Sequence, residues 1–229
     1  MPGMRNVLLI LIILVQLILV SCKKDAPPSI VYEEEVTIAR DSSPLINESD
    51  NEPDRVIWQK PEMVMELLGD LKDKTVADIG AGSGFFTFRL LQQAKKVIAV
   101  DIDKEPLEKM RLLSQKLDTA ISNKLEIKLG QPSDPGLGLK SVDIVFLSNT
   151  YMYIKDRENY LTNLKRYLKP EARILIIDYK RKNIPFGPPY EERVGMNKAE
   201  RELKEAGYSI EKTDDLSLDY QYILIARSK

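Results

Sequence analysis

The stretch VADIGAGSGFFTFRL, residues 76–90, decides the fold of this chain. A short apolar run ends at Asp78, and three glycines follow within five residues, at Gly80, Gly82 and Gly84. A plain strand-to-helix turn needs one or two glycines, because glycine tolerates positive φ. Three glycines in alternation favour a turn on which a ligand lies against the backbone, with the amides that open the next helix facing an anion.

The composition excludes several kinds of catalytic site in this chain. It has 229 residues, of which 30% are charged and 43% hydrophobic, as expected for one globular domain with a core. With no histidine and one cysteine, it lacks the residues for a Ser-His-Asp site, a His-ligated metal or an internal disulfide. We predict no metal site. The net charge of −1 gives no sign of a nucleic-acid-binding surface, so we expect no nucleic-acid partner.

From residue 54 onward, apolar strands alternate with helices. Strands are predicted where apolar residues run together, and helices where they recur every three or four positions. The predicted strands are Thr75–Ile79, Lys96–Val100, Leu125–Leu129, Val142–Leu147, Arg173–Asp178, Ser209–Lys212 and Tyr220–Ala226, and the predicted helices are Pro61–Leu68, Phe85–Gln93, Pro106–Leu117, Asp156–Leu168 and Asn197–Ala206. Asp156 is expected to cap its helix and Pro170 to end it. This alternation predicts an α/β fold, with a mostly parallel sheet covered on both faces.

The spacing of the glycines separates two classes of cofactor. The dinucleotide fingerprint is G-x-G-x-x-G, but its last position is Phe85 here, which disfavours a nicotinamide oxidoreductase. The pattern is instead D-x-G-x-G-x-G, followed by VIAVDID at residues 97–103. It resembles the first signature of class I S-adenosylmethionine-dependent methyltransferases, of the type 11 or type 25 kind. Three later segments extend the resemblance over about Trp58–Arg227: GQPSDPGLGLKSVDIVFLSNTYMYI, YLTNLKRYLKPEARILIIDYK and AERELKEAGYSI.

The resemblance implies a Rossmann-like, three-layer αβα fold with a doubly wound, seven-stranded, mostly parallel sheet. It implies S-adenosyl-L-methionine as the cofactor. The residues carried over are Asp78, Gly80, Ala81 and Gly82 at the methionine part, Asp101 at the ribose hydroxyls, Ile102, Gln131 and Pro132 at the adenine, and Asn149 near the cofactor's amino group. A carboxylate can accept both hydroxyls of a cis-diol, which suits Asp101. Asp103 is the alternative ribose ligand, or the N-cap of the following helix.

The sequence departs from the family pattern at three positions. Gln131 stands where an acidic residue is common, Met152 where a histidine is frequent, and Glu171 where glycine is usual. No histidine can act as a general base. Tyr151 and Asp178 are the weak catalytic candidates, although Tyr151 suits an aromatic wall of the methyl site better. Trp58 could cover the cofactor or pack the first helix, and the segment 180–195 could cover the acceptor site or form a solvated basic turn.

The first 53 residues are predicted to lie outside the domain. Residues 1–21 read as a bacterial lipoprotein signal peptide, because an apolar run from Val7 to Val20 ends in Leu-Val-Ser-Cys, which resembles a lipobox. Cys22 would then be lipidated and would anchor the protein to a membrane of the cell envelope, on its periplasmic or surface side. An uncleaved signal anchor is the alternative. Residues 22–53 read as a flexible acidic tether and residues 54–229 as the methyltransferase domain.

Two functions therefore follow from the sequence. The first is a membrane-tethered methyltransferase that acts on a small-molecule or lipid-like acceptor. The second is a catalytically inactive extracytoplasmic binding module on the same fold, which the departures at Gln131 and Met152 would fit. The intact glycine turn and Asp101 favour the first. The sequence gives no oligomeric state.

Overall fold

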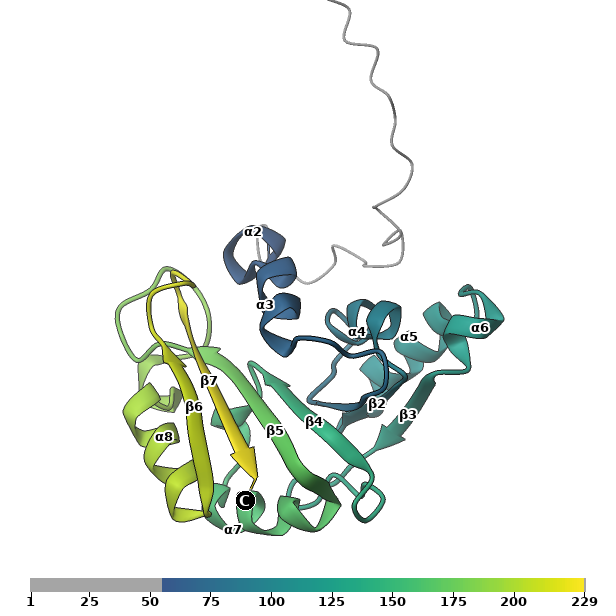
Figure 1. Cartoon of the computed structure of the whole chain (residues 1–229). Coiled ribbons are helices and arrows are strands. Elements are labelled where there is room, and N and C mark those ends of the chain that lie inside the picture. The colour runs from purple at the N-terminus through teal and green to yellow at the C-terminus, as the bar shows by residue number, and fades with distance from the viewer. Residues whose placement is uncertain (1–54, 229) are drawn as a thin grey trace, which may run out of the picture. The chain divides into compact units, whose positions relative to one another are not determined.

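The computed structural model describes residues 55–228. The predicted signal peptide, Cys22 and the acidic tether lie outside these residues. Within them, seven strands form one sheet in the order β3-β2-β1-β4-β5-β7-β6 (Figure 1). The strands are β1 (Thr75–Ile79), β2 (Lys96–Asp101), β3 (Leu125–Leu129), β4 (Val142–Ser148), β5 (Leu168–Tyr179), β6 (Tyr208–Asp214) and β7 (Gln221–Ser228). Neighbouring strands from β3 to β5 are parallel, and β7 is antiparallel to both of its neighbours.

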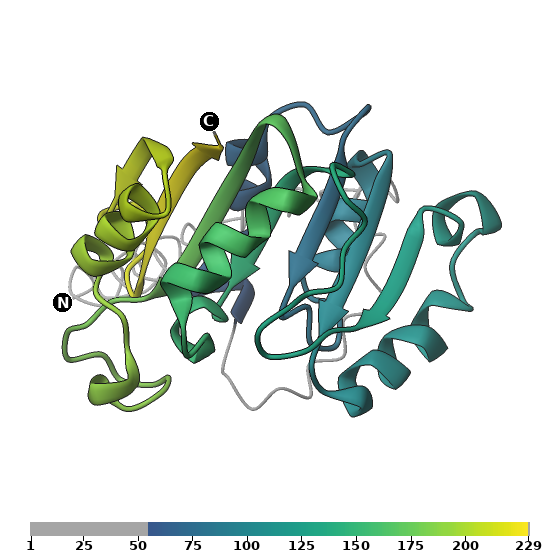
Figure 2. The same cartoon turned by 90° about the horizontal axis from the view of Figure 1, so that it is seen from below.

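Helices cover both faces of the sheet, as Figure 2 shows from below. One face packs against α3 (Pro61–Leu68), α4 (Thr87–Gln93) and α5 (Lys104–Ser114), and the other against α7 (Arg157–Leu164) and α8 (Met196–Glu205). Two shorter helices are α2 (Arg55–Gln59) and α6 (Thr119–Ser122), and three 3-10 turns are η1 (Tyr151–Tyr153), η2 (Lys165–Tyr167) and η3 (Tyr190–Glu192). The predicted three-layer, Rossmann-like, doubly wound fold is confirmed.

The largest departure from the predicted elements lies between α7 and β5. The helix predicted to reach Leu168 ends at Leu164, and β5 already begins at Leu168, which pairs with Val142. Pro170 therefore lies inside a strand and does not end a helix. Glu171 adopts a left-handed φ of 63°, the conformation that glycine accepts most easily. Asp156 lies at the N-cap of α7, but its side chain makes no capping hydrogen bond.

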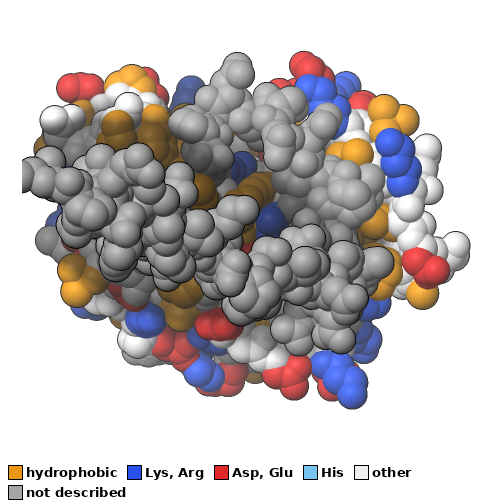
Figure 3. All heavy atoms as spheres, turned by 90° about the horizontal axis from the view of Figure 1, so that it is seen from above, with side chains coloured by type: hydrophobic (Ala, Val, Ile, Leu, Met, Phe, Trp, Pro, Cys, Tyr) orange, Lys and Arg blue, Asp and Glu red, His pale blue; other side chains and the backbone are white. Residues whose placement is uncertain are grey.

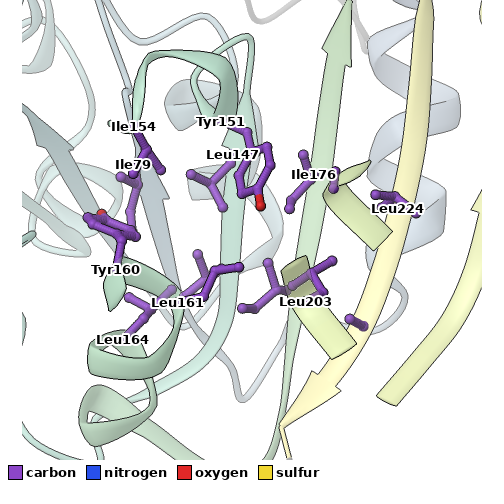
Figure 4. Packing of buried hydrophobic residues seen from close by; sticks show 14 of the residues in the cluster. Ile79, Leu147, Tyr151, Ile154, Tyr160, Leu161, Leu164, Ile176, Leu203 and Leu224 are labelled. Carbon is purple, nitrogen blue, oxygen red and sulfur yellow. The ribbon is translucent and has the colours of Figure 1, made fainter. Parts of the chain in front are cut away.

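The two layers between sheet and helices hold the buried apolar side chains. Figure 4 shows the cluster on the α7 and α8 side, where Leu161 and Leu164 of α7 and Leu203 of α8 face Leu147 and Ile176 of the sheet. All five side chains are at most 1% exposed. Burial of this kind supplies most of the favourable free energy of folding and fixes the strand order.

The order of the strands reverses between β1 and β4. The chain runs outward from β1 to β2 and β3 and then returns to β4 beside β1. Ligands in such sheets bind beyond the carboxyl ends of the strands at this point. Among residues 55–228, no helix is long and apolar enough to span a bilayer.

We predict that Leu161→Ala lowers the free energy of unfolding by about 2–5 kcal/mol, because it leaves a cavity in this core. The matched control is Leu216→Ala, because Leu216 is 91% exposed and its truncation should change stability by less than about 0.5 kcal/mol. Urea unfolding followed by circular dichroism measures both. Equal effects in the two variants would contradict the packing described.

Candidate functional site

The glycine turn leads from the carboxyl end of β1 to α4 and is hydrogen-bonded to the carboxyl end of β2. The backbone N–H groups of Gly80 and Ala81 donate to the Val100 carbonyl at 2.8 and 3.0 Å. Gly80 and Gly82 have φ of 76° and 55°, which an L side chain rarely adopts. A Cβ on Gly80 would lie 2.1 Å from Thr150 Oγ1, whereas a Cβ on Gly82 would meet no protein atom within 4 Å. The turn is therefore closed toward β4 at Gly80 and open at Gly82.

Asp101 lies against this turn, at the end of β2. Its Oδ2 accepts a hydrogen bond from Gly82 N at 2.8 Å, and its Oδ1 accepts one from Asp103 N at 3.0 Å. A carboxylate has room for further hydrogen bonds on each oxygen. Asp103 caps α5, because its side chain accepts from Glu105 N. The structure thus places Asp101 beside the glycines, as predicted. Asp103 has the other role considered for it, the N-cap of α5.

Asp78 is buried beneath the turn, where it joins β1 to α4. It is 2% exposed, and its Oδ2 accepts a hydrogen bond from Thr87 Oγ1 at 2.6 Å. Burial raises the pKa of this carboxyl from 3.8 to about 6, while the hydrogen bond from Thr87 and the charge of Arg55 act in the opposite direction. In this arrangement the side chain of Asp78 holds α4 against β1.

The residues predicted for the adenine lie together at the ends of β2 and β3. Ile102 follows Asp101 and is 61% exposed. The Gly130 N–H donates to the Asp101 carbonyl at 2.8 Å, which brings the loop after β3 to the same place. In that loop the backbones of Gln131 and Asp134 form an isolated antiparallel β-bridge, and Gln131 and Pro132 are both exposed. An apolar surface and an amide side chain are therefore available side by side.

Asn149 follows β4, and its side chain bonds to β7. It has a left-handed φ of 56°, and its Oδ1 accepts a hydrogen bond from Gln221 Nε2 of β7. Its neighbour Thr150 contacts Gly80 instead. The predicted place of Asn149 near the cofactor's amino group stays a prediction, and Thr150 is a neighbour of the glycine turn that the sequence analysis did not identify. No local sequence pattern predicts that Asn149 contacts Gln221 or that Thr150 contacts Gly80.

Tyr151 points away from this edge, into the α7 and α8 face. Its ring lies near Leu147 and Ile176, with the hydroxyl directed toward the side of Leu203 (Figure 4). It is fully buried, and its hydroxyl donates to Glu202 Oε2 at 2.6 Å. Burial and the bond to Glu202 raise its pKa above the ordinary value. This placement corrects the candidate role of Tyr151 in lining the methyl site or transferring a proton.

Asp178 is on the same face as Tyr151, at the end of β5. It is 1% exposed, and its carboxylate accepts hydrogen bonds from Met152 N at 3.0 Å and Tyr179 N at 2.7 Å. Burial raises its pKa from 3.8 to about 6, and the backbone hydrogen bonds limit the rise. The bond from Met152 N holds η1 in place, which is a structural role. The geometry does not support Asp178 as a catalytic group.

Helix α2 lies over the carboxyl edge of the sheet (Figure 1). Gln59 is fully buried and donates from Nε2 to Ser148 Oγ at 2.8 Å. Trp58 is 5% exposed, and its ring centroid lies 6.0 Å from Tyr179 and 5.0 Å from Phe186. Trp58 thus packs α2 on the core, as one of the two roles considered for it requires, and its covering of the cofactor stays a prediction. The sequence analysis did not identify α2 as a helix.

The basic residues of segment 180–195 are largely occupied within the protein. Lys180 Nζ donates to the Leu218 carbonyl at 2.7 Å, and Arg193 donates to the carbonyls of Pro188 and Lys182 at 2.7 and 2.8 Å. Figure 3 looks onto this edge and shows basic, acidic and hydrophobic side chains intermixed among the described residues. Lys180 and Arg193 are therefore held by backbone carbonyls of the protein.

Comparison with known proteins agrees with this geometry. Residues 70–218 match the family model described as "Methyltransferase domain". A solved S-adenosylmethionine-dependent methyltransferase from Aquifex aeolicus is 26% identical, with a TM-score of 0.71 over 78% of this chain and 94% of that one. The matched residues 70–218 run from before β1 to the turn between β6 and β7.

Two curated relatives match about half of the chain. Phosphoethanolamine N-methyltransferase 1 of Triticum aestivum is 31% identical over 52% of this chain and 24% of its own length. The tRNA U34 carboxymethyltransferase of Ruthia magnifica subsp. Calyptogena magnifica is 34% identical over 51% of this chain and 38% of its own length. The chain thus spans well under half of either relative. A tRNA-modifying relative does not fit the expectation that nucleic acid is excluded as an acceptor, and the acceptor is not established.

We predict that Asp78→Asn changes the pH dependence of stability. The pKa of Asp78 is raised in the folded protein, so the carboxyl stabilises the fold most below pH 3.8, and this contribution is lost as the pH rises through about 6. The free energy of unfolding of the variant, relative to that of the wild type, should rise by about 2 kcal/mol from pH 4 to pH 7 and stay constant above. Urea unfolding at each pH measures it, with exposed Asp73→Asn as the control that should follow the wild type. A difference in free energy of unfolding that does not change with pH would contradict the raised pKa of Asp78.

Proposed function

The chain belongs to the methyltransferase-domain family of S-adenosylmethionine-dependent enzymes, and on that premise we propose that it transfers a methyl group to a small-molecule or lipid-like acceptor. S-adenosylmethionine supplies a methyl group that is already activated by the sulfonium charge. What the protein must contribute is orientation of the acceptor and exclusion of water, which can lower a barrier by about 7–11 kcal/mol.

The residues of the glycine turn fit the cofactor of this family. The single observation that carries the proposal is the open space in front of Gly82, beside a carboxylate that already holds the Gly82 amide. Gly80–Gly82 would hold the methionine part, and Asp101 the ribose hydroxyls. Ile102, Gln131 and Pro132 would hold the adenine. Asp78 would support the turn from below, through Thr87 and α4.

We place the acceptor at the other half of the carboxyl edge, beyond the cofactor. Beyond β4, the ends of β5 and β7 are covered by α2 and by segment 180–195, with aromatic side chains between them. The wheat relative acts, by its name, on phosphoethanolamine, which supports an amine acceptor for this chain. Membrane attachment through lipidated Cys22, and hence a cell-envelope location, is supported by the lipobox-like sequence alone. A catalytically inactive binding module is the alternative.

We predict that Gly82→Ala weakens binding of S-adenosylmethionine by tenfold or more. Its Cβ would enter space that no protein atom occupies, so a steric effect on affinity has to come from the ligand. Gly69→Ala is the control, because Gly69 has equally open space and lies at the end of α3, away from the turn. Its φ of 73° and ψ of −152° are essentially restricted to glycine, so Gly69→Ala should lose about 1–3 kcal/mol of stability. Gly82→Ala should lose about 1–2 kcal/mol, but only Gly82→Ala should lose affinity in calorimetric titration of the full chain in detergent.

The same titration tests the ribose contact. Asp101→Asn should lower the affinity, and Asp103→Asn, two residues away, should leave it within about twofold. Failure of the well-folded wild type to bind S-adenosylmethionine would remove the enzyme function and leave the binding module. Binding without methyl transfer to any acceptor would point to the same alternative.

We predict that Cys22→Ala moves the protein from the membrane to the soluble fraction of an expressing bacterial cell. The physical reason is that lipid chains on Cys22 would supply about 0.8 kcal/mol for each buried CH₂ group. Fractionation with an alkyne-labelled fatty acid measures both the location and the label. Ser21→Ala is the neighbouring control and should keep both. A labelled or membrane-bound Cys22→Ala variant would contradict the lipoprotein assignment.

A further inference from the structure

The sheet has two edge strands, β3 and β6, and they differ in regularity. β6 pairs with β7, and its register shifts between Ile210 and Lys212. An irregularity of this kind bends an edge strand and hinders the addition of a further strand. β3 pairs with β2, and its five residues, Leu125–Leu129, follow an unbroken parallel register. Figure 1 shows β3 at the opposite end of the sheet from β6, and no strand of the described residues lies beyond it.

The hydrogen bonds to β2 show which backbone groups of β3 face outward. The Lys124 carbonyl accepts from Val97 N at 2.9 Å, and Gly130 N donates to the Asp101 carbonyl at 2.8 Å. In a parallel ladder alternate residues bond to the neighbouring strand, so the even-numbered residues from 124 to 130 face β2. The outward N–H and C=O groups therefore belong to Leu125, Ile127 and Leu129. Residues 55–228 contain no hydrogen-bond partner for these outward groups.

The side chains of β3 are apolar on one face of the sheet and charged on the other. Leu125 and Ile127 are half-buried against the apolar cluster on the α4 and α5 side. Leu129 lies two residues further along the same face and is 44% exposed. Side chains alternate between faces along a strand, so Glu126 and Lys128 lie on the other face. The edge is therefore an apolar stripe with one acidic and one basic side chain behind it.

Both charged side chains of β3 can take a further partner. Glu126 Oε2 lies 2.7 Å from Lys96 Nζ of β2, and the Glu126 side chain is 42% exposed. A carboxylate can accept from more than one donor. Lys128 forms no ion pair or side-chain hydrogen bond with any other described residue. The ammonium group of Lys128 is thus available to a carboxylate on another molecule, and the carboxylate of Glu126 to an ammonium group.

The sequence of β3, Leu-Glu-Ile-Lys-Leu, complements itself when two copies run antiparallel. With Ile127 opposite Ile127 of a second copy, each leucine meets a leucine, and Glu126 meets Lys128. The outward groups of residues 125, 127 and 129 then fall in the hydrogen-bonded pairs of an antiparallel ladder, in which both N–H groups donate across the strands. Glu126 and Lys128 fall in the non-hydrogen-bonded pairs, where side chains lie closer together. Backbone, apolar side chains and charges all agree on this one arrangement.

The charges select this register among those that the backbone allows. A slip of two residues in either direction keeps the outward groups paired. One such slip places Glu126 opposite Glu126 of the second copy, and the other places Lys128 opposite Lys128. Like charges directly opposite one another destabilise an antiparallel pair, whereas opposite charges stabilise it. The edge of β3 is therefore complementary to a second copy of itself in a single register.

We propose that β3 is the interface of a two-fold dimer of this chain, in which two β3 strands pair antiparallel about Ile127 and join the two sheets into one. The dimer does not depend on the methyl transfer proposed above. Because the two strands run in opposite directions, the two glycine turns lie at opposite edges of the joined sheet, and each is formed within one chain. Five paired residues are few beside the roughly 20–30 residues a side of a standard interface, so the dimer dissociates on dilution.

Sedimentation velocity of the full chain in density-matched detergent tests this pairing. The wild type should pass from monomer to dimer over about a hundredfold rise in concentration. Lys128→Glu alone places carboxylates opposite one another, and Glu126→Lys alone places ammonium groups opposite one another, so each should raise the dimer Kd about tenfold. An equimolar mixture of the two variants should restore the dimer, because every cross-strand pair then has opposite charges. Lys116→Glu, the same charge reversal at an exposed lysine outside β3, is the matched control and should keep the wild-type Kd.

Two results would overturn the dimer. One is a wild type that stays monomeric at every concentration, whether the edge stays open or another segment of the same chain covers it. The other is a dimer that Lys128→Glu leaves intact, or that a mixture of the two folded variants does not restore, because the interface would then lie elsewhere. The Tm of each variant shows that it is folded, and Lys128→Glu beside Lys116→Glu decides the matter if Glu126→Lys does not fold. A wild type that fails to bind S-adenosylmethionine would remove the proposed function and leave the dimer standing.

Discussion

The site depends on how closely the ends of β1, β2 and β4 approach one another at Gly80. The Gly80 and Ala81 amides reach across to the Val100 carbonyl of β2, while Thr150, after β4, occupies the place that a side chain at Gly80 would need. A residue with a Cβ would push β4 away and open the edge of the sheet. Because the turn is fixed on both sides, the next residues have little freedom. Gly82 is left with its amide on Asp101 and its other side open.

The two faces of the sheet differ in how their buried polar groups are paired at this edge. On the α7 and α8 face, buried carboxylates are fully engaged: Glu202 accepts from Tyr151 and from Arg157, and Asp178 accepts from the backbone of η1. These bonds hold the loop after β4 from behind. On the opposite face, polar atoms at Trp58 and Gln221 are left unpaired, although each costs about 1–3 kcal/mol when buried. The hydroxyl of Tyr222 is a third unpaired atom, and nothing in the structure explains it.

The sequence predicts what depends on local pattern and misses what depends on distant partners. Short apolar runs located all seven strands, and the glycine spacing located the turn beside Asp101, because both signals lie within a few residues. The start of β5 was missed because Pro170 suggests a stop, whereas the strand tolerates it and Glu171 takes the left-handed conformation. Helix α2 has five residues, too few to show helical periodicity.

In the candidate site, too, local patterns were predicted and contacts between distant residues were missed. Asp101 was placed correctly beside the glycines because strand ends in a parallel sheet meet at one edge. Tyr151 was misplaced because the direction of a side chain after a strand depends on the turn that follows, and here η1 directs the ring to Glu202. The partner of Asn149 is Gln221, 72 residues away. No spacing in a single sequence indicates that contact.

Helix α2 connects the chemistry of the site to the first part of the chain. Five residues cannot form a stable helix alone, so its position depends on the bond of Gln59 to Ser148 and on the packing of Trp58 against Tyr179. Under the proposed lipidation, 32 residues separate Cys22 from Arg55, and an extended chain of that length spans about 110 Å. An anchored protein would therefore reach lipid headgroups and soluble molecules alike. The anchor cannot choose between them, so the choice of acceptor falls to the folded domain and the groups at the carboxyl edge of its sheet.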